Sequence, residues 1–146
     1  MMYLLDFAGT LFDFAAFEEY DRSRSSGPYM PGELSRFLYP DARSFLIEKG
    51  NSAMIVTAAD KIADANFMQS ALDGIPRIAV MYTNGVLKGA FLAPYISMYG
   101  TSPIFIDDSP SHLASMTQEC PQAQLFEMRR DGRWPVIHAL AELPSV

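Results

Sequence analysis

The chain has 146 residues, of which 49% are hydrophobic, and it carries a net charge of −6. This length and composition favour one folded domain over residues 1–146 and exclude a disordered chain. The acidic balance argues against nucleic acid or an anionic membrane as a partner, because both would repel the chain.

A short apolar run, Tyr3–Leu5, opens the chain and predicts a buried parallel strand. Asp6 follows it, at the carboxyl end of the strand, where open α/β sheets bind their ligands. Gly9 lets the backbone pass close to a bound group and turn its N–H groups toward it. A carboxylate beside such amides suits covalent phosphoryl transfer, and the alternative is that Asp6 only caps a turn.

Two features of the sequence bear on the cellular compartment of the protein. The apolar N-terminal run has no basic flank and is interrupted by Asp6, so it matches neither a signal peptide nor a membrane span. The lone cysteine, Cys120, excludes an internal disulfide and a cysteine-based zinc site, and we expect it to be buried and inert. A cytoplasmic protein is therefore expected.

Residues 12–31 look irregular, and the polar stretch 22–28 reads as a loop. We expect this segment, called the flap below, to lie over the Asp6 end of the sheet and to be too short for a separate cap domain. Arg22 and Arg24 are either solvated or placed to contact an anionic substrate.

Helix and strand signals alternate from residue 31 onward. The predicted helices are a turn or two within 31–38, then 40–49, 60–72, 89–99, 111–119 and 134–143. The predicted strands are 52–57, 77–83, 103–107 and 122–128. This alternation requires parallel pairing with right-handed crossovers, and so predicts a three-layer α/β/α sandwich around a five-stranded Rossmann-like sheet.

Two polar residues stand where a phosphate could bind. Thr57 closes the second predicted strand and can bind a phosphoryl oxygen, although a capping role explains it equally well. Lys88 follows the turn at Asn84 and can neutralise charge between an acidic cluster and a phosphate. Lys61 is the reserve candidate, and Lys49 is expected to face solvent.

Asp107 and Asp108 end the fourth predicted strand. Two adjacent carboxylates repel each other and stay ionised easily only near a cation, and oxygen ligands favour Mg²⁺ over zinc. The alternative is that Asp108 or Ser109 caps the next helix. We expect a surface or capping role for His112 and a solvated polar turn at 129–133.

The stretch Asp6-Phe-Ala-Gly-Thr-Leu resembles the first motif of the haloacid dehalogenase-like (HAD) superfamily, Asp-x-Asp-Gly-Thr-Leu. Thr57, Lys88 and the Asp107–Asp108 pair are similar to the later motifs and follow in the family's order, so the resemblance covers nearly the whole chain. It implies the sheet order 5-4-1-2-3, which places the first strand between the second and the fourth.

The resemblance also implies hydrolysis of a phosphate ester through an aspartyl-phosphate. Asp6 would be the nucleophile, acting on a small phosphorylated substrate or a phosphoprotein. The implied Mg²⁺ ligands are Asp6, the backbone carbonyl of Ala8, Asp107 and Asp108. The implied phosphate-binding groups are Ala8, Gly9, Thr57 and Lys88.

The sequence departs from the motif at Ala8, where the family has the aspartate that acts as general acid. Such a group typically contributes about 10²–10⁴-fold to the rate. The chain is then either a hydrolase that is slow or restricted to good leaving groups, such as acyl phosphates or aryl esters, or one in which Asp13 or Asp60 replaces the acid. The other alternative is an inactive module that binds Mg²⁺ and a phosphorylated ligand or protein partner.

Two related classes fit less well. Phosphonoacetaldehyde hydrolase also has Asp-x-Ala-Gly-Thr, but it needs a cap lysine, and no lysine precedes Lys49 here. A phosphoacceptor receiver domain carries its acidic pair on the first strand, whereas here the pair comes late. The HAD-like interpretation is therefore preferred.

Overall fold

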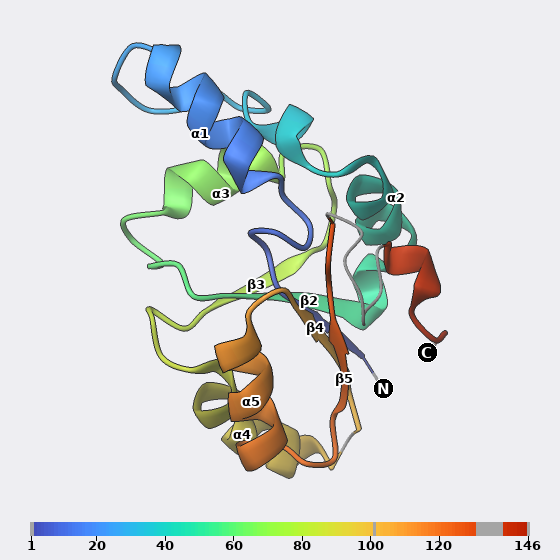
Figure 1. Cartoon of the computed structure of the whole chain (residues 1–146). Coiled ribbons are helices and arrows are strands. Elements are labelled where there is room, and N and C mark those ends of the chain that lie inside the picture. Colours follow the sequence, from blue (N-terminus) through green and yellow to red (C-terminus); the bar gives the residue numbers. More distant parts are fainter. Residues whose placement is uncertain (1, 101, 131–138, 146) are drawn as a thin grey trace.

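In the computed structural model, the described residues are 2–100, 102–130 and 139–145. They contain one parallel sheet of five strands in the order β3-β2-β1-β4-β5, which is the predicted order read from the other edge (Figure 1). The strands are β1 (Tyr3–Leu5), β2 (Ala53–Thr57), β3 (Ala79–Tyr82), β4 (Ile104–Asp107) and β5 (Gln124–Glu127).

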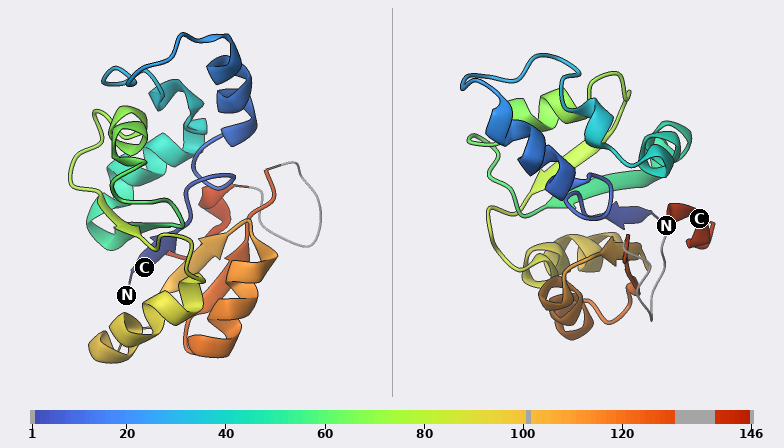
Figure 2. Two further views of the ribbon diagram at one scale, coloured as in Figure 1. Left: turned by 90° about the vertical axis from the view of Figure 1, so that its left-hand side faces the viewer. Right: turned by 45° about the horizontal axis from the view of Figure 1, so that its top comes forward.

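Helices cover both faces of the sheet. Helices α1 to α3 lie on one side and α4 and α5 on the other, so the predicted three layers are confirmed (Figures 1 and 2). The helices are α1 (Phe14–Ser23), α2 (Pro40–Lys49), α3 (Ala65–Ala71), α4 (Lys88–Tyr99) and α5 (Pro110–Glu119), with 3₁₀ turns η1 (Ser35–Phe37), η2 (Gly50–Ser52) and η3 (Leu140–Glu142). None of the described helices combines the length and apolar character that a membrane crossing needs.

The central strand is buried on both faces, as a strand covered by two helical layers must be. Tyr3 and Leu5 pack into the apolar cluster under α1 to α3, whereas Leu4 packs into the cluster under α4 and α5. β1 pairs in parallel with β2 on one side and β4 on the other. The residue after Leu5, which is Asp6, therefore emerges at the middle of the sheet's carboxyl edge.

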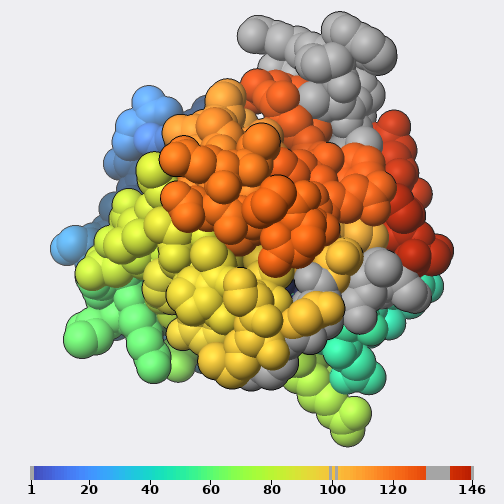
Figure 3. Space-filling model, turned by 90° about the horizontal axis from the view of Figure 1, so that it is seen from below, coloured from blue at the N-terminus to red at the C-terminus, as the bar shows by residue number. Residues whose placement is uncertain are grey.

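Helices α4 and α5 lie side by side over the second face (Figure 3). A side chain at Gly89 would overlap the Ser115 carbonyl, and the Gly89 N–H donates to the Ser115 hydroxyl at 2.9 Å. Cys120 is fully buried, as expected, and its thiol donates to the Gly89 carbonyl. His112 caps α4, because its Nδ1 accepts the backbone N–H of Lys88 at 3.2 Å. These contacts fix the start of α4, where Lys88 stands.

The flap is more regular than predicted. The expectation of an irregular segment is wrong for Phe14–Ser23, which forms α1. Asp13 caps this helix by accepting the Ala16 N–H at 3.1 Å, and Phe17 is buried beneath it. The polar stretch 22–28 that suggested a loop begins only at the end of the helix.

The helix predicted from Asp60 begins later than expected, at Ala65. The Asp60 carboxylate accepts the N–H groups of Ile62 and Ala63, at 2.9 and 2.7 Å, so residues 60–64 form a polar turn instead. The first half of the helix predicted at 134–143 lies outside the described residues, and the second half contains only the 3₁₀ turn η3.

Candidate active site

The sheet brings three polar strand ends to one edge. Asp6 follows β1, Thr57 ends β2 and Asp107 ends β4, and these three strands are neighbours. Asp6 continues the ladder past β1, because its N–H donates to the Ile106 carbonyl at 2.9 Å. One carboxylate oxygen each of Asp6, Asp107 and Asp108 lies within 4.8 Å of the others. The ends of β1, β2 and β4 therefore lie at the same edge of the sheet, as predicted.

Lys88 reaches this cluster from the first residue of α4. Its Nζ lies 2.5 Å from Asp6 Oδ1 and 2.6 Å from Asp107 Oδ2, and only 1% of its side chain is exposed. The reserve candidate Lys61 is exposed, and Lys49 lies 3.9 Å from Glu48 at the surface. Among the lysines, Lys88 alone has its ammonium group in the acidic cluster.

The cluster holds more negative charge than Lys88 compensates. Burial raises the pKa of Asp6 to about 6, although the Lys88 ammonium pulls it down. Burial likewise raises the pKa values of Asp107 and Asp108. Burial disfavours the charged form of Lys88, but the carboxylates of Asp6 and Asp107 outweigh it and raise the lysine pKa. With all three acids ionised, one ammonium leaves two negative charges uncompensated.

The loop after Asp6 packs directly against the acidic pair. Gly9 has φ +81°, and a side chain there would overlap the Asp108 carboxylate. The Gly9 N–H donates to the Phe12 carbonyl at 2.9 Å, so it is directed within the loop instead of toward a ligand. Glycine at this position therefore serves the close approach of Asp108. The Thr10 hydroxyl, which sequence reasoning gave no role, donates to Asp6 Oδ2 at 3.2 Å.

Thr57 occupies the place expected of it. Its hydroxyl oxygen accepts the Ala59 N–H at 3.3 Å, which closes a turn after β2. The alternative of a helix cap does not hold, because α3 begins only at Ala65. A hydroxyl that accepts one hydrogen bond still has its own hydrogen to donate. Thr57 lines the same cavity as Asp6, so a phosphoryl group bound in this cavity could contact both side chains.

An arginine from the far end of the chain fixes the same loop. The prediction of a solvated turn at 129–133 is wrong for Arg130, which donates twice to the Thr10 carbonyl, at 2.6 and 3.0 Å. Arg130 also pairs with Asp41 at 2.8 Å and lies over the Tyr39 ring. No local pattern marks this residue, because its partners are about a hundred positions away in sequence.

The two suggested replacements for the missing acid have other contacts. Asp60 holds the 60–64 turn, and Asp13 caps α1. Asp13 also lines a cavity of about 410 Å³ with Gly9 and Asp108, so its use as an acid stays a hypothesis. Asp108 is followed by Ser109, and it is Ser109 that caps α5.

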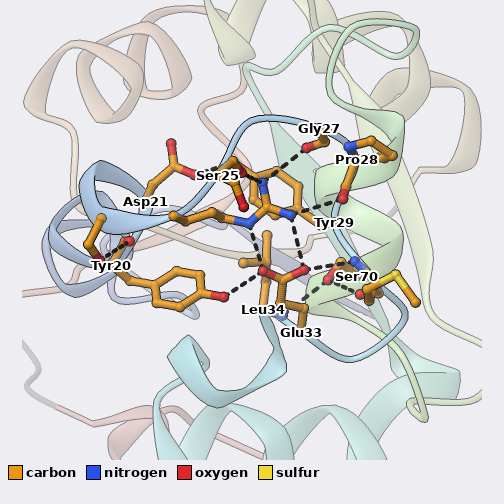
Figure 4. Close-up of polar contacts among 12 residues, drawn as sticks. Tyr20, Asp21, Ser25, Gly27, Pro28, Tyr29, Glu33, Leu34 and Ser70 are labelled. Carbon is orange, nitrogen blue, oxygen red and sulfur yellow. Dashed lines mark hydrogen bonds and ion pairs between the residues drawn. The ribbon is translucent and has the colours of Figure 1, made fainter.

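The flap arginines do not face the acidic cluster. The alternative that Arg24 contacts a substrate is not supported, because its guanidinium pairs with Glu33 at 2.7 Å. Glu33 also accepts the Tyr20 hydroxyl at 2.5 Å and the Met30 N–H at 2.9 Å (Figure 4). Arg22 is exposed and donates to its own helix.

A cavity of about 610 Å³ opens beside the acidic cluster. Asp6, Ala8 and Thr57 line it, and so do Phe14 and Phe17 from α1. The expectation of a flap beside the Asp6 end of the sheet thus corresponds to a helix that supplies aromatic side chains. Sequence reasoning missed these two residues because it treated their segment as irregular.

Comparison with known proteins supports the fold assignment. No family model and no curated protein matches the sequence. The structure is similar to a solved structure from Burkholderia xenovorans LB400 that is provisionally described as a haloacid dehalogenase-like hydrolase, with a TM-score of 0.60 over 87% of this chain and 80% of that chain. The two sequences are 16% identical, so the similarity shows a common fold. The chain thus shares the fold of that HAD-like protein, which is the fold expected from the sequence.

Proposed function

We propose that the chain is a Mg²⁺-dependent phosphohydrolase that acts through an aspartyl-phosphate on Asp6. The observation that carries this proposal is the buried group formed by Asp6, Lys88, Asp107 and Asp108 at the carboxyl end of the central strand. A carboxylate held in place by a lysine, beside two further carboxylates, is suited to nucleophilic attack on a phosphate in the presence of a divalent cation.

The residues present fit Mg²⁺. The donors are carboxylate oxygens, which this ion prefers, and with all three acids ionised the cluster has two negative charges beyond the one that Lys88 compensates. Asp6, Asp108 and the carbonyl of Ala8 would hold the ion, with Asp107 oriented beside them by Lys88. When bound, the ion neutralises charge between the nucleophile and the phosphoryl group.

The chain's own residues then divide the remaining tasks. Lys88 and the Thr10 hydroxyl hold the two oxygens of Asp6, and so orient the carboxylate that attacks phosphorus. The bond from phosphorus to the leaving oxygen breaks, and the leaving group departs with the electron pair. The Thr57 hydroxyl donates to a phosphoryl oxygen. Water then attacks the phosphorus of the aspartyl-phosphate, which releases phosphate and restores the Asp6 carboxylate.

Ala8 limits the substrates that this site can use. It lines the cavity beside Asp6 at the place of the family's general acid, and a methyl group cannot protonate a departing alkoxide. Substrates whose leaving groups are stable as anions, which are acyl and aryl phosphates, should therefore react faster than alkyl phosphates. The second candidate, an inactive module that binds Mg²⁺ and a phosphorylated ligand, is favoured by the same alanine.

Turnover of acetyl phosphate, measured with Mg²⁺ and with EDTA, separates the two candidates. For an enzyme, Asp6→Asn should lower kcat by at least about 10³-fold, as loss of a nucleophile does. The matched control is Asp73→Asn, an exposed carboxylate outside the cluster. Full activity in Asp6→Asn contradicts the proposal. Absence of turnover together with Mg²⁺-dependent binding of fluoroberyllate indicates the inactive module.

A further inference from the structure

The cavity beside Asp6 has an aromatic wall that phosphoryl transfer itself does not require. Its volume of about 610 Å³ is in the range of small-molecule sites. Asp6 and Thr57 line it, so a molecule inside it would lie next to the proposed nucleophile. Five aromatic side chains also line it: Phe7, Phe14, Phe17, Tyr29 and Phe67.

The aromatic wall is already packed before any ligand binds. The rings of Phe17 and Phe67 lie edge to face with their centroids 5.0 Å apart, and Phe14 lies 5.5 Å from Phe17. Phe17 is buried, whereas 42% of Phe14 is exposed. Covering an exposed phenylalanine ring with an apolar ligand is favourable, and ring pairs add to the gain from buried area.

The flap carries Phe14, Phe17 and Tyr29 of this wall, and it is hydrogen-bonded to α3, which carries Phe67. The Tyr29 N–H donates to Asn66 Oδ1 at 2.7 Å, and Asn66 Nδ2 donates to the Tyr29 carbonyl at 2.9 Å. Glu33 draws the same segment together, because it accepts hydrogen bonds from the Tyr20 hydroxyl and from Arg24. Arg24 in turn donates to the carbonyls of Ser25, Gly27 and Pro28 (Figure 4). The wall is therefore built into the fold and does not depend on a ligand to form.

The charge of the cavity is negative. Asp6, Asp21 and Asp64 line it, and among the described residues no lysine or arginine does. Arg24 lies over the Tyr29 ring at 4.3 Å, but its guanidinium pairs with Glu33. Lys88 stands behind Asp6 and is occupied by two carboxylates. Asp21 accepts the Tyr29 hydroxyl at 2.8 Å, which leaves its charge in place. An anionic group on the leaving group would thus be repelled, and a cationic one attracted.

From this wall and this charge we infer that the leaving group is an aromatic ring, uncharged or positively charged, that stacks against Phe14. The inference rests on the proposed function and narrows its substrates to aryl phosphates. In the reaction, Asp6 attacks phosphorus and the bond from phosphorus to the aryl oxygen breaks. The phenolate leaves with the electron pair and takes its proton from solvent, so the alanine at position 8 is no obstacle.

The charge preference is tested with two aryl phosphates whose phenols have similar acidity. 4-(Trimethylammonio)phenyl phosphate is cationic on the ring, and 4-sulfonatophenyl phosphate is anionic. We expect kcat/KM to favour the cationic substrate by at least about tenfold. The ratio should fall in Asp64→Asn and Asp21→Asn, whose amide oxygens can still accept the hydrogen bonds made by the carboxylates. Equal turnover of both substrates by the parent protein overturns the inference.

The ring contact is tested with Phe14→Ala. Its kcat/KM for the cationic aryl phosphate, divided by that for acetyl phosphate, should be about tenfold below the parent ratio, because acetyl phosphate has no ring. Ile47→Ala, which removes an exposed apolar side chain on α2, should leave this ratio unchanged. An unchanged ratio in Phe14→Ala contradicts the stacking.

A binding measurement keeps the inference separate from the chemistry. If acetyl phosphate and both aryl phosphates are not turned over, the proposed function fails. NMR titration of the parent protein with the product phenols then tests the aromatic, cation-binding site independently of turnover. Binding of 4-hydroxyphenyltrimethylammonium, weakened in Phe14→Ala and absent for 4-hydroxybenzenesulfonate, supports an aromatic and cationic site. No binding of the cationic phenol overturns it.

Discussion

At the scale of single residues, the proposed function makes position 8 the residue that decides which leaving groups the site can expel. Ala8 lines the cavity beside Asp6 and cannot donate a proton. Lys88 and Thr10 both hold the carboxylate of Asp6, the proposed nucleophile. The proposed site therefore combines a carboxylate held in place with an alanine where the proposed reaction would use an acid.

Ala8→Asp should restore the acid. We expect kcat/KM for alkyl phosphates to rise by about 10²-fold or more, with little gain for acetyl phosphate, whose leaving group needs no proton. The measurement is a plot of log kcat/KM against the pKa of the leaving group. It should be steep for the parent protein and shallow for the variant, and equal slopes would show that position 8 does not control departure.

Lys88 is a second single-residue case, and here the measurement is stability. Lys88→Met leaves Asp6 and Asp107 buried without their cation, which should lower the free energy of unfolding by about 3 kcal/mol or more. Urea unfolding at neutral pH measures this change. Lys61→Met, at an exposed lysine, should change it by less than about 0.5 kcal/mol. Similar values for the two variants would argue against a structural ion pair at Lys88.

At the scale of elements, the flap depends on one carboxylate. Glu33 is bound by Arg24, by the Tyr20 hydroxyl and by the Met30 N–H, and these contacts hold the segment between α1 and η1. The hydrogen bond from Arg24, followed by those from Tyr20 and Met30, lowers the Glu33 pKa to about 2. The wall of the cavity is therefore sensitive to the charge of a residue that does not line it.

The sign of the pH effect follows from the lowered pKa. Ionised Glu33 stabilises the folded state above its ordinary pKa of 4.5, and this stabilisation is lost as the pH falls from there toward about 2. Glu33→Gln should thus be less stable than the parent at neutral pH, with the difference in unfolding free energy shrinking between pH 5 and pH 3. Urea unfolding across this range measures it. Glu48→Gln, an exposed control on α2, should differ little from the parent throughout, and a constant deficit in Glu33→Gln would exclude a role for its charge.

At the scale of the whole molecule, the sheet order creates the site. β1 lies between β2 and β4, so Asp6 is flanked by the ends of the strands that carry Thr57 and Asp107. The periodic patterns in the sequence predicted all five strands to within a few residues. The strand order came from the family resemblance and is confirmed by the structure.

Other parts of the site could not be predicted from local patterns. Arg130 contacts the Thr10 carbonyl across 120 positions, and nothing near either residue indicates the pairing. α1 could not be predicted because residues 12–31 look mixed and irregular, and the polar residues at its end indicate a loop. The aromatic wall could not be predicted either, because its residues come from separate segments that only the fold brings together.

Trapping of the covalent intermediate tests the central claim most directly. The protein is mixed with acetyl phosphate and Mg²⁺, quenched in acid and reduced with borohydride, which converts a phosphorylated aspartate to homoserine. Mass spectrometry of the peptides should then find homoserine at position 6, and only when Mg²⁺ was present. Turnover without homoserine at position 6, or homoserine at Asp13 or Asp108 instead, would contradict the account.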